Sequence, residues 1–120
     1  MKSFDLRAPM LVLLHGEMGA GKTTFVKEVV RRLNPDAVVT SPTFNIINQY
    51  ADNIFHADLY RIKDVKELEN TDFFEILYGD NIFFIEWPYN NVSPRIYDGL
   101  NVTNIKIEVM DNEERKITVN

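Results

Sequence analysis

Short apolar runs separated by polar turns follow one another along the chain. Met10–His15 is a continuous apolar run with the length of a buried parallel strand. A glycine-bearing loop at residues 16–21 follows, and apolar residues then recur at helical spacing from Lys22 to Leu33. This expected apolar stripe consists of Phe25, Val26, Val29, Val30 and Leu33. The pair Asn34-Pro35 predicts the end of the helix, because proline has no amide hydrogen to donate.

The remaining apolar runs predict six further strands and two short helices. The helices are expected at residues 64–69 and 72–78, and turns at residues 51–53, 79–81 and 111–114. The strands are expected at residues 37–40, 44–50, 54–57, 82–86, 105–109 and 117–119. The first two strands and the helix between them would form a βαβ unit. We therefore expect an α/β fold with flanking helices and a mixed, mostly parallel β-sheet.

Composition limits the classes of protein to which the chain could belong. The 120 residues suit one domain spanning residues 1–120, and the contents of 45% hydrophobic and 26% charged residues are ordinary for a globular protein. The net charge of −5 argues against a protein that grips nucleic acid alone with a basic face. The absence of cysteine excludes disulfides and thiolate metal sites within these residues. The apolar run near the start is too short for a signal peptide or a membrane span, so we expect a cytoplasmic protein with no membrane contact.

One motif carries specific chemistry. The residues from Gly16 to Thr23 match the phosphate-binding P-loop pattern G-x-x-x-x-G-K-[ST] at every fixed position. Glycines let the backbone curl so that successive N–H groups point at phosphate oxygens, and the helix that follows adds its positive end. Lys22 would reach the β- and γ-phosphates, while the Thr23 hydroxyl would ligate Mg²⁺. The expected nucleotide-binding residues are Gly16, Glu17, Met18, Gly19, Ala20, Gly21, Lys22, Thr23 and Thr24.

Two carboxylates are candidates for the acid that a P-loop protein needs near its metal. Glu86 ends the apolar run 82–86, and Asp58 follows the apolar run 54–57. Both would lie at carboxyl ends of strands, where open α/β sheets bind ligands. Either acid could position an attacking water. A solvated charge at Glu86 and a turn or cap role for Asp58 are the alternatives.

Other nearby residues have both a functional and a structural interpretation. His56 could orient a carboxylate or be a structural histidine, and Trp87 could be a stacking surface or a core aromatic. Arg61 could offset phosphate charge or pair with a surface acid. Ser41 and Thr43 lie in a segment that could order around a γ-phosphate like a switch loop, or could form an ordinary turn.

In chain order, the segments GEMGAGKTTF, SPTF, HADLYR and IEWP closely resemble the bacterial TsaE (YjeE) family. The resemblance covers residue 10 to about residue 88. It implies a P-loop NTPase fold and slow, partner-dependent ATP hydrolysis in the biosynthesis of tRNA threonylcarbamoyladenosine. The implied partners are TsaD-like and TsaB-like proteins, with tRNA contacted only through the complex. The choice of ATP rather than GTP follows from this resemblance.

By the same resemblance, Lys22 and Thr23 take the P-loop roles and Thr43 is the switch threonine. Asp58 is the acid of the HADLYR segment, and Glu86 is the metal-side acid beside Trp87. The chain departs from the family pattern in three ways. Glu17 stands where the family often has aspartate. Pro88 and Tyr89 stand where a second acid is common, and the segment before the first strand is short.

Two other functions compete with a partner-dependent ATPase. A small-molecule kinase would need an acceptor pocket and an arginine-bearing lid, and screening metabolites for phosphate transfer would identify it. A nucleotide-gated binding module would use ATP to order a partner surface without appreciable hydrolysis. An ATP analogue would then support partner binding as strongly as ATP does.

Overall fold

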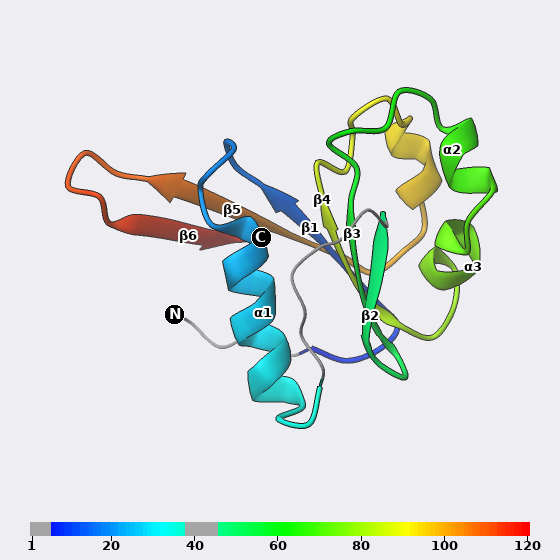
Figure 1. The fold of residues 1–120 in the computed structure, drawn as a ribbon, viewed down its shortest axis with the longest axis horizontal. Coiled ribbons are helices and arrows are strands. Elements are labelled where there is room, and N and C mark those ends of the chain that lie inside the picture. Colours follow the sequence, from blue (N-terminus) through cyan, green and yellow to red (C-terminus); the bar gives the residue numbers. More distant parts are fainter. Residues whose placement is uncertain (1–5, 38–45) are drawn as a thin grey trace.

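A single six-stranded sheet organises the chain in the computed structural model, which describes residues 6–37 and 46–120 (Figure 1). The strand order is β2-β3-β4-β1-β5-β6. The inner strands β3, β4, β1 and β5 run parallel, while β2 and β6 each close an antiparallel hairpin at an edge. The strands are β1 (Met10–His15), β2 (Ile47–Ala51), β3 (Ile54–Asp58), β4 (Ile82–Glu86), β5 (Val102–Val109) and β6 (Arg115–Val119). The predicted mixed, mostly parallel sheet is confirmed.

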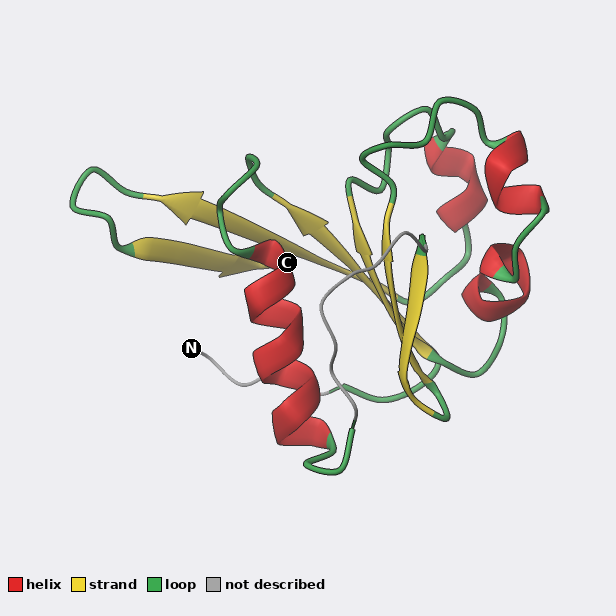
Figure 2. Ribbon diagram, in the orientation of Figure 1, coloured by secondary structure: helices red, strands yellow, loops and turns green. Residues whose placement is uncertain are grey.

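Helices cover both faces of this sheet (Figure 2). The long helix α1 (Lys22–Leu33) packs on one face, and α2 (Lys66–Glu69) and α3 (Phe73–Leu77) lie on the other with the short 3-10 helix η1 (Pro94–Tyr97). Arg31 and Arg32 in the last turn of α1 place positive charge at the negative end of the helix dipole. The helix ends before Pro35, as predicted.

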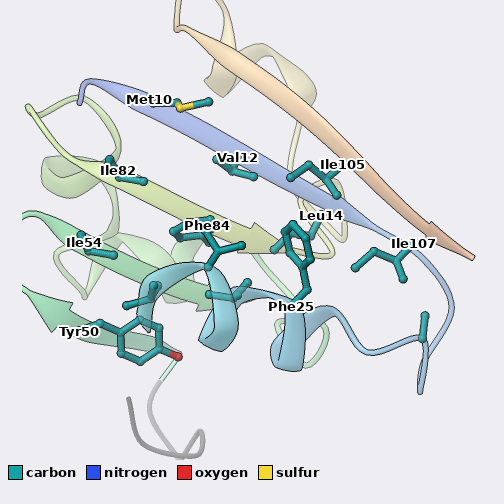
Figure 3. Packing of buried hydrophobic residues seen from close by; sticks show 14 residues of the cluster. Met10, Val12, Leu14, Phe25, Tyr50, Ile54, Ile82, Phe84, Ile105 and Ile107 are labelled. Atoms are coloured by element: carbon teal, nitrogen blue, oxygen red, sulfur yellow. The ribbon is translucent and has the colours of Figure 1, made fainter. Parts of the chain in front are cut away.

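Apolar side chains of the central strands point alternately to the two faces of the sheet and form two hydrophobic cores. On β1, Val12 and Leu14 face α1, and Leu11 and Leu13 face α2 and α3. On β4, Phe84 belongs to the α1 side, where Figure 3 shows it between Ile54 and Leu14. Because successive side chains of a strand point to opposite faces, one continuous apolar run supplies both cores.

Several sequence expectations need correction or lie outside the described residues. Leu33, predicted on the buried stripe of α1, is 40% exposed because it occupies the last helical position. The hairpin strand predicted to begin at residue 105 begins at Val102, since it also pairs in parallel with β1. Val109 at its end is exposed. Residues 38–45 are not described, so the strand predicted at 37–40 stays a prediction.

The sheet places three strand ends together. In the register of β1, β4 and β3, Glu86 pairs with both Leu14 and Asp58. The loop after β1 and the two candidate carboxylates therefore lie together at the carboxyl ends of the parallel strands, as expected for a parallel sheet. Among the described residues, no helix combines the length and apolarity that crossing a membrane requires.

Candidate phosphate-binding site

A cavity of about 680 Å³ lies where the loop after β1 meets the ends of β3 and β4. Its volume falls within the usual range for small-ligand sites. The lining residues come from the loop, both strand ends and the closing hairpin, and include Met18, Gly19, Gly21, Lys22, Thr23, Thr24, Asp58, Tyr60, Arg61, Glu86, Trp87 and Arg115. The structure thus brings together most of the site residues predicted from the sequence.

The loop backbone takes a form that glycine permits. Gly21 has φ 95° and stands immediately before α1, and Gly19 has φ 84°. Gly16 meets a different constraint, because a Cβ there would lie 2.6 Å from the Ile107 carbonyl oxygen of β5. Glycine at residue 16 therefore allows the loop to lie directly against a strand that pairs with β1.

The start of α1 is open to an external acceptor. Gly21 offers no side-chain cap, and the first turn contains no acidic residue. The first N–H groups of a helix have no acceptor within the helix, so they must find one elsewhere. A phosphate group at this position would accept those hydrogen bonds and would meet the positive end of the helix dipole.

Lys22 is folded into the site rather than extended into solvent. Its Nζ donates a hydrogen bond of 2.5 Å to the Gly16 carbonyl oxygen and lies 3.9 Å from the centroid of the Trp87 ring. Burial lowers the pKa of Lys22, while the negative charges of Glu86 and Asp58 oppose that change. The Gly16 carbonyl and the aromatic face thus hold a cationic group beside the phosphate loop.

A chain of hydrogen bonds fixes Glu86. The Thr23 hydroxyl donates to Glu86 Oε2 over 2.8 Å, and His56 Nε2 donates to the same oxygen over 2.5 Å. On the other side of the ring, His56 Nδ1 and the Tyr50 hydroxyl lie 2.8 Å apart, within hydrogen-bond distance. The chain therefore runs from Tyr50 through His56 to Glu86, and a second donor reaches Glu86 from the P-loop.

The protonation states follow from this arrangement. Burial by itself would raise the pKa of Glu86, but the hydrogen bond and the charge of His56, the hydrogen bond from Thr23 and the charge of Lys22 outweigh it and hold the pKa below 4.5. Burial, with a contribution from the charge of Glu86, raises the pKa of Tyr50 to about 12. Near neutral pH, the Glu86 carboxylate is thus ionised and the Tyr50 hydroxyl keeps its proton. Because the Thr23 proton points to Glu86, the lone pairs of its oxygen are available to a cation.

Asp58 forms a local turn contact and also faces the cavity. Its Oδ1 accepts the Tyr60 N–H over 3.0 Å, which is a local turn interaction. It also lines the cavity, and burial raises its pKa above 3.8 despite that hydrogen bond. The two carboxylates of the site therefore differ, since the pKa of Glu86 is lowered and that of Asp58 is raised.

Trp87 lies in the site, half-buried, with the strained value φ 56° directly after Glu86. Its ring packs against Lys22. It also packs against Tyr60, and the centroids of the Trp87 and Tyr60 rings are 5.0 Å apart. Arg61 is exposed at the rim of the cavity. Ser41 and Thr43 lie outside the described residues, so their switch role stays a prediction.

Mg²⁺ suits the donors that are present. Among residues 6–37 and 46–120, no group of three or more acidic or histidine side chains could enclose a metal ion. Thr23 and Glu86 nevertheless supply two adjoining oxygen donors. Mg²⁺ usually takes one or two protein oxygens together with water and substrate phosphates, so this sparse set fits.

The sequence patterns singled out neither Tyr50 nor Arg115 as a site residue. The β2–β3 pairing changes register between Gln49 and Ala51, and this irregularity includes Tyr50, which contacts His56. Arg115 begins β6, and its Nε donates to the Ala20 carbonyl oxygen over 2.7 Å. No motif marks either residue, because each enters the site only through strand pairing.

Comparisons with known proteins agree with the geometry. A family model described as "Threonylcarbamoyl adenosine biosynthesis protein TsaE" matches residues 2–117. A "tRNA threonylcarbamoyladenosine biosynthesis protein TsaE" of Rickettsia prowazekii (strain Madrid E) is 33% identical over 122 residues, which cover 96% of this chain and 80% of that protein. The protein of the same name from Aquifex aeolicus (strain VF5) is 34% identical over 120 residues, covering 95% and 79%.

A solved structure, "Crystal structure of Bacillus subtilus YdiB", superimposes with a TM-score of 0.63 at 29% identity. The match covers 93% of this chain and 68% of the solved one. This likeness confirms the P-loop type of α/β fold predicted from the sequence.

Proposed function

Because the chain belongs to the TsaE family of tRNA threonylcarbamoyladenosine biosynthesis proteins, we propose that it is the ATP-binding and ATP-hydrolysing subunit of that modification. The observation that carries the proposal is the hydrogen bond of 2.8 Å from Thr23 of the P-loop to Glu86 of β4. It joins the phosphate-binding loop to an ionised carboxylate, the pairing that a P-loop hydrolase uses around its metal.

The loop would bind the triphosphate through its main-chain N–H groups and the uncapped start of α1. Lys22 would exchange the Gly16 carbonyl for phosphate oxygens, which are stronger acceptors for a cation. Trp87, whose ring lies 3.9 Å from Lys22 Nζ, would keep the ammonium group in the site during this exchange. Mg²⁺, held by Thr23 with Glu86 behind it, would supply charge neutralisation at the β- and γ-phosphates.

Hydrolysis would proceed by in-line attack of water on the γ-phosphorus, breaking the bond to the β–γ bridging oxygen and releasing ADP and phosphate. Glu86 is already engaged by Thr23 and His56, so we assign it to the metal side. Asp58 faces the cavity and has a raised pKa, so we assign it to orienting the water. Lys22 would stabilise the charge that develops on the phosphoryl oxygens.

We place this activity in the cytoplasm, in a complex with TsaD-like and TsaB-like proteins. The net charge of −5 supports contact with tRNA through those partners rather than directly. The exposed side chain of Tyr60 lines the site, and the exposed Tyr89 ring packs against His15 at the end of β1. A partner that contacts these two residues would respond to the bound nucleotide.

Binding and hydrolysis by Lys22→Ala and Glu86→Gln test the proposal. With Mg²⁺ present, we expect Lys22→Ala to lose nucleotide binding measured by calorimetry. We expect Glu86→Gln to bind ADP within about fivefold of the parent, a difference of roughly 1 kcal/mol, but to lose most phosphate release. Lys66→Ala, which removes an exposed lysine of α2, is the matched control and should behave like the parent.

Equal rates of phosphate release by the parent and both site variants would refute the assignment. Copurification with TsaD-like and TsaB-like proteins, with and without ATP, tests the partner assignment separately. We expect ATP to strengthen capture of the parent but not of Lys22→Ala.

A further inference from the structure

Arg115 reaches the P-loop from the opposite end of the chain. Its Nε donates to the Ala20 carbonyl oxygen over 2.7 Å, a contact between residues separated by 95 positions. The guanidinium also covers Gly21, where an added Cβ would lie 2.9 Å from Nε and 3.3 Å from Cζ. The side chain therefore lies against the last turn of the loop, directly before Lys22.

The closing hairpin sets this position. Arg115 is the first residue of β6 and pairs with Val109 of β5. The β5 strand pairs in parallel with β1, which leads into the P-loop, so β5 and β6 extend beside that loop (Figure 1). The Gly16 contact with Ile107 brings the loop close to β5. The arginine is thus held by sheet pairing on one side and by the Ala20 carbonyl on the other.

The charge of Arg115 is not used by these contacts. No ion pair involving Arg115 is found within the described ranges 6–37 and 46–120. A guanidinium has five N–H donors, and the bond to Ala20 uses the one on Nε. The side chain lines the same cavity as Lys22 and Thr24. Arg115 is exposed to solvent, and its remaining N–H donors are able to bind an anionic ligand in this cavity.

We propose that Arg115 is a further phosphate-binding residue, whose terminal nitrogens contact the polyphosphate of the nucleotide while Nε stays on Ala20. The inference rests on the proposed nucleotide-binding function and adds a ligand from the closing hairpin. Arginine suits this position because its planar fork can bind a carbonyl and a phosphate at the same time, which a lysine ammonium does less well.

Calorimetric titration of Mg²⁺-ADP and of inorganic tripolyphosphate into the parent, Arg115→Gln and Arg115→Lys tests the proposal. We expect Arg115→Gln to lose roughly ten- to hundredfold in affinity for both ligands, the range for a charge-assisted hydrogen bond. Arg115→Lys should fall between the parent and Arg115→Gln, because it keeps the charge. Lys116→Ala, which removes the neighbouring exposed cation of β6, should leave both affinities unchanged.

The salt dependence separates a phosphate contact from a purely structural one. If Arg115 contacts phosphate, the affinity of Arg115→Gln for tripolyphosphate should fall less steeply with added salt than that of the parent. Unchanged affinities in Arg115→Gln would overturn the proposal, and so would equal losses in Arg115→Gln and Arg115→Lys. A loss for ADP without a loss for tripolyphosphate would instead place Arg115 against the base. If the parent itself binds neither ligand, the proposed function fails as well.

Discussion

At the scale of single residues, the site depends on two carboxylates whose surroundings act in opposite directions. Glu86 receives hydrogen bonds from His56 and Thr23, which favour its charged form. Asp58 is half-buried with weaker compensation, so its charged form is disfavoured. One acid is therefore fixed as an anion, while the other is better able to take up a proton.

This difference predicts opposite pH dependences for two isosteric variants. The folded-state pKa of Glu86 is lowered, so its contribution to stability is present above 4.5 and is lost as pH falls through the folded-state value. The folded-state pKa of Asp58 is raised, so its contribution is present below 3.8 and is lost as pH rises through the folded-state value. We expect Glu86→Gln to be destabilised at pH 7 by about 1–3 kcal/mol, and by less near pH 3.5.

Asp58→Asn should show the reverse, becoming more stable relative to the parent as pH rises. Urea unfolding of the three proteins between pH 3.5 and 7, without nucleotide, measures both differences. The assignment of the two environments is wrong if the two variants diverge from the parent in the same direction as pH increases.

At the scale of elements, the P-loop depends on its contact with a neighbouring strand as well as on its own motif. Gly16 leaves no room for a side chain against the Ile107 carbonyl of β5, and Arg115 of β6 bonds to Ala20. The β5–β6 hairpin therefore supports the loop from the side opposite the strand ends β3 and β4. A change at the contact between the loop and the hairpin should therefore lower the affinity for the nucleotide.

Gly16→Ala tests this support. The new Cβ would meet the Ile107 oxygen at 2.6 Å, so the loop and β5 must separate. We expect at least about a tenfold loss of nucleotide affinity, equivalent to roughly 1.4 kcal/mol, measured by titration with Mg²⁺-ADP.

Gly99→Ala is the control, since Gly99 also has positive φ but no atom within 4 Å of an added Cβ. It should cost about 1–2 kcal/mol of stability from backbone strain and leave affinity unchanged. Parental affinity in Gly16→Ala would show that the loop does not depend on its contact with β5.

At the scale of the whole molecule, one sheet serves two cores. Ile85 belongs to the core under α2 and α3, whereas Ile105 belongs to the core under α1, and both are fully buried. Because β1 and β4 contribute to both cores, neither face can lose its packing without disturbing the strands that support the other. We propose that the chain unfolds as a single domain.

Ile85→Val and Ile105→Val test this coupling with the same chemical change on opposite faces. Each should reduce the free energy of unfolding by about 0.5–1.5 kcal/mol, the usual cost of removing one buried methylene group. In urea, each variant should unfold in one transition at a lower urea concentration than the parent, and the dependence of its unfolding free energy on urea concentration should be unchanged. Two separated transitions in either variant would show that the faces unfold independently.

The sequence by itself determined the features that depend on neighbouring residues. Eight consecutive residues define the P-loop, because its form depends on local backbone freedom and on the helix that follows. Apolar periodicity located all six strands of the described sheet and the three α-helices, with errors of a few residues at their ends. The strand-end positions of Asp58 and Glu86 followed from the same pattern.

Only the tertiary structure decided which distant residues meet. Thr23 and Glu86 are 63 positions apart, and Ala20 and Arg115 are 95 positions apart. Tyr50 lies beside His56 where the β2–β3 register shifts, and Trp87 lies beneath Lys22. These contacts depend on strand order and register, which result from packing the whole sheet. The strand order cannot be predicted from a local pattern of residue types.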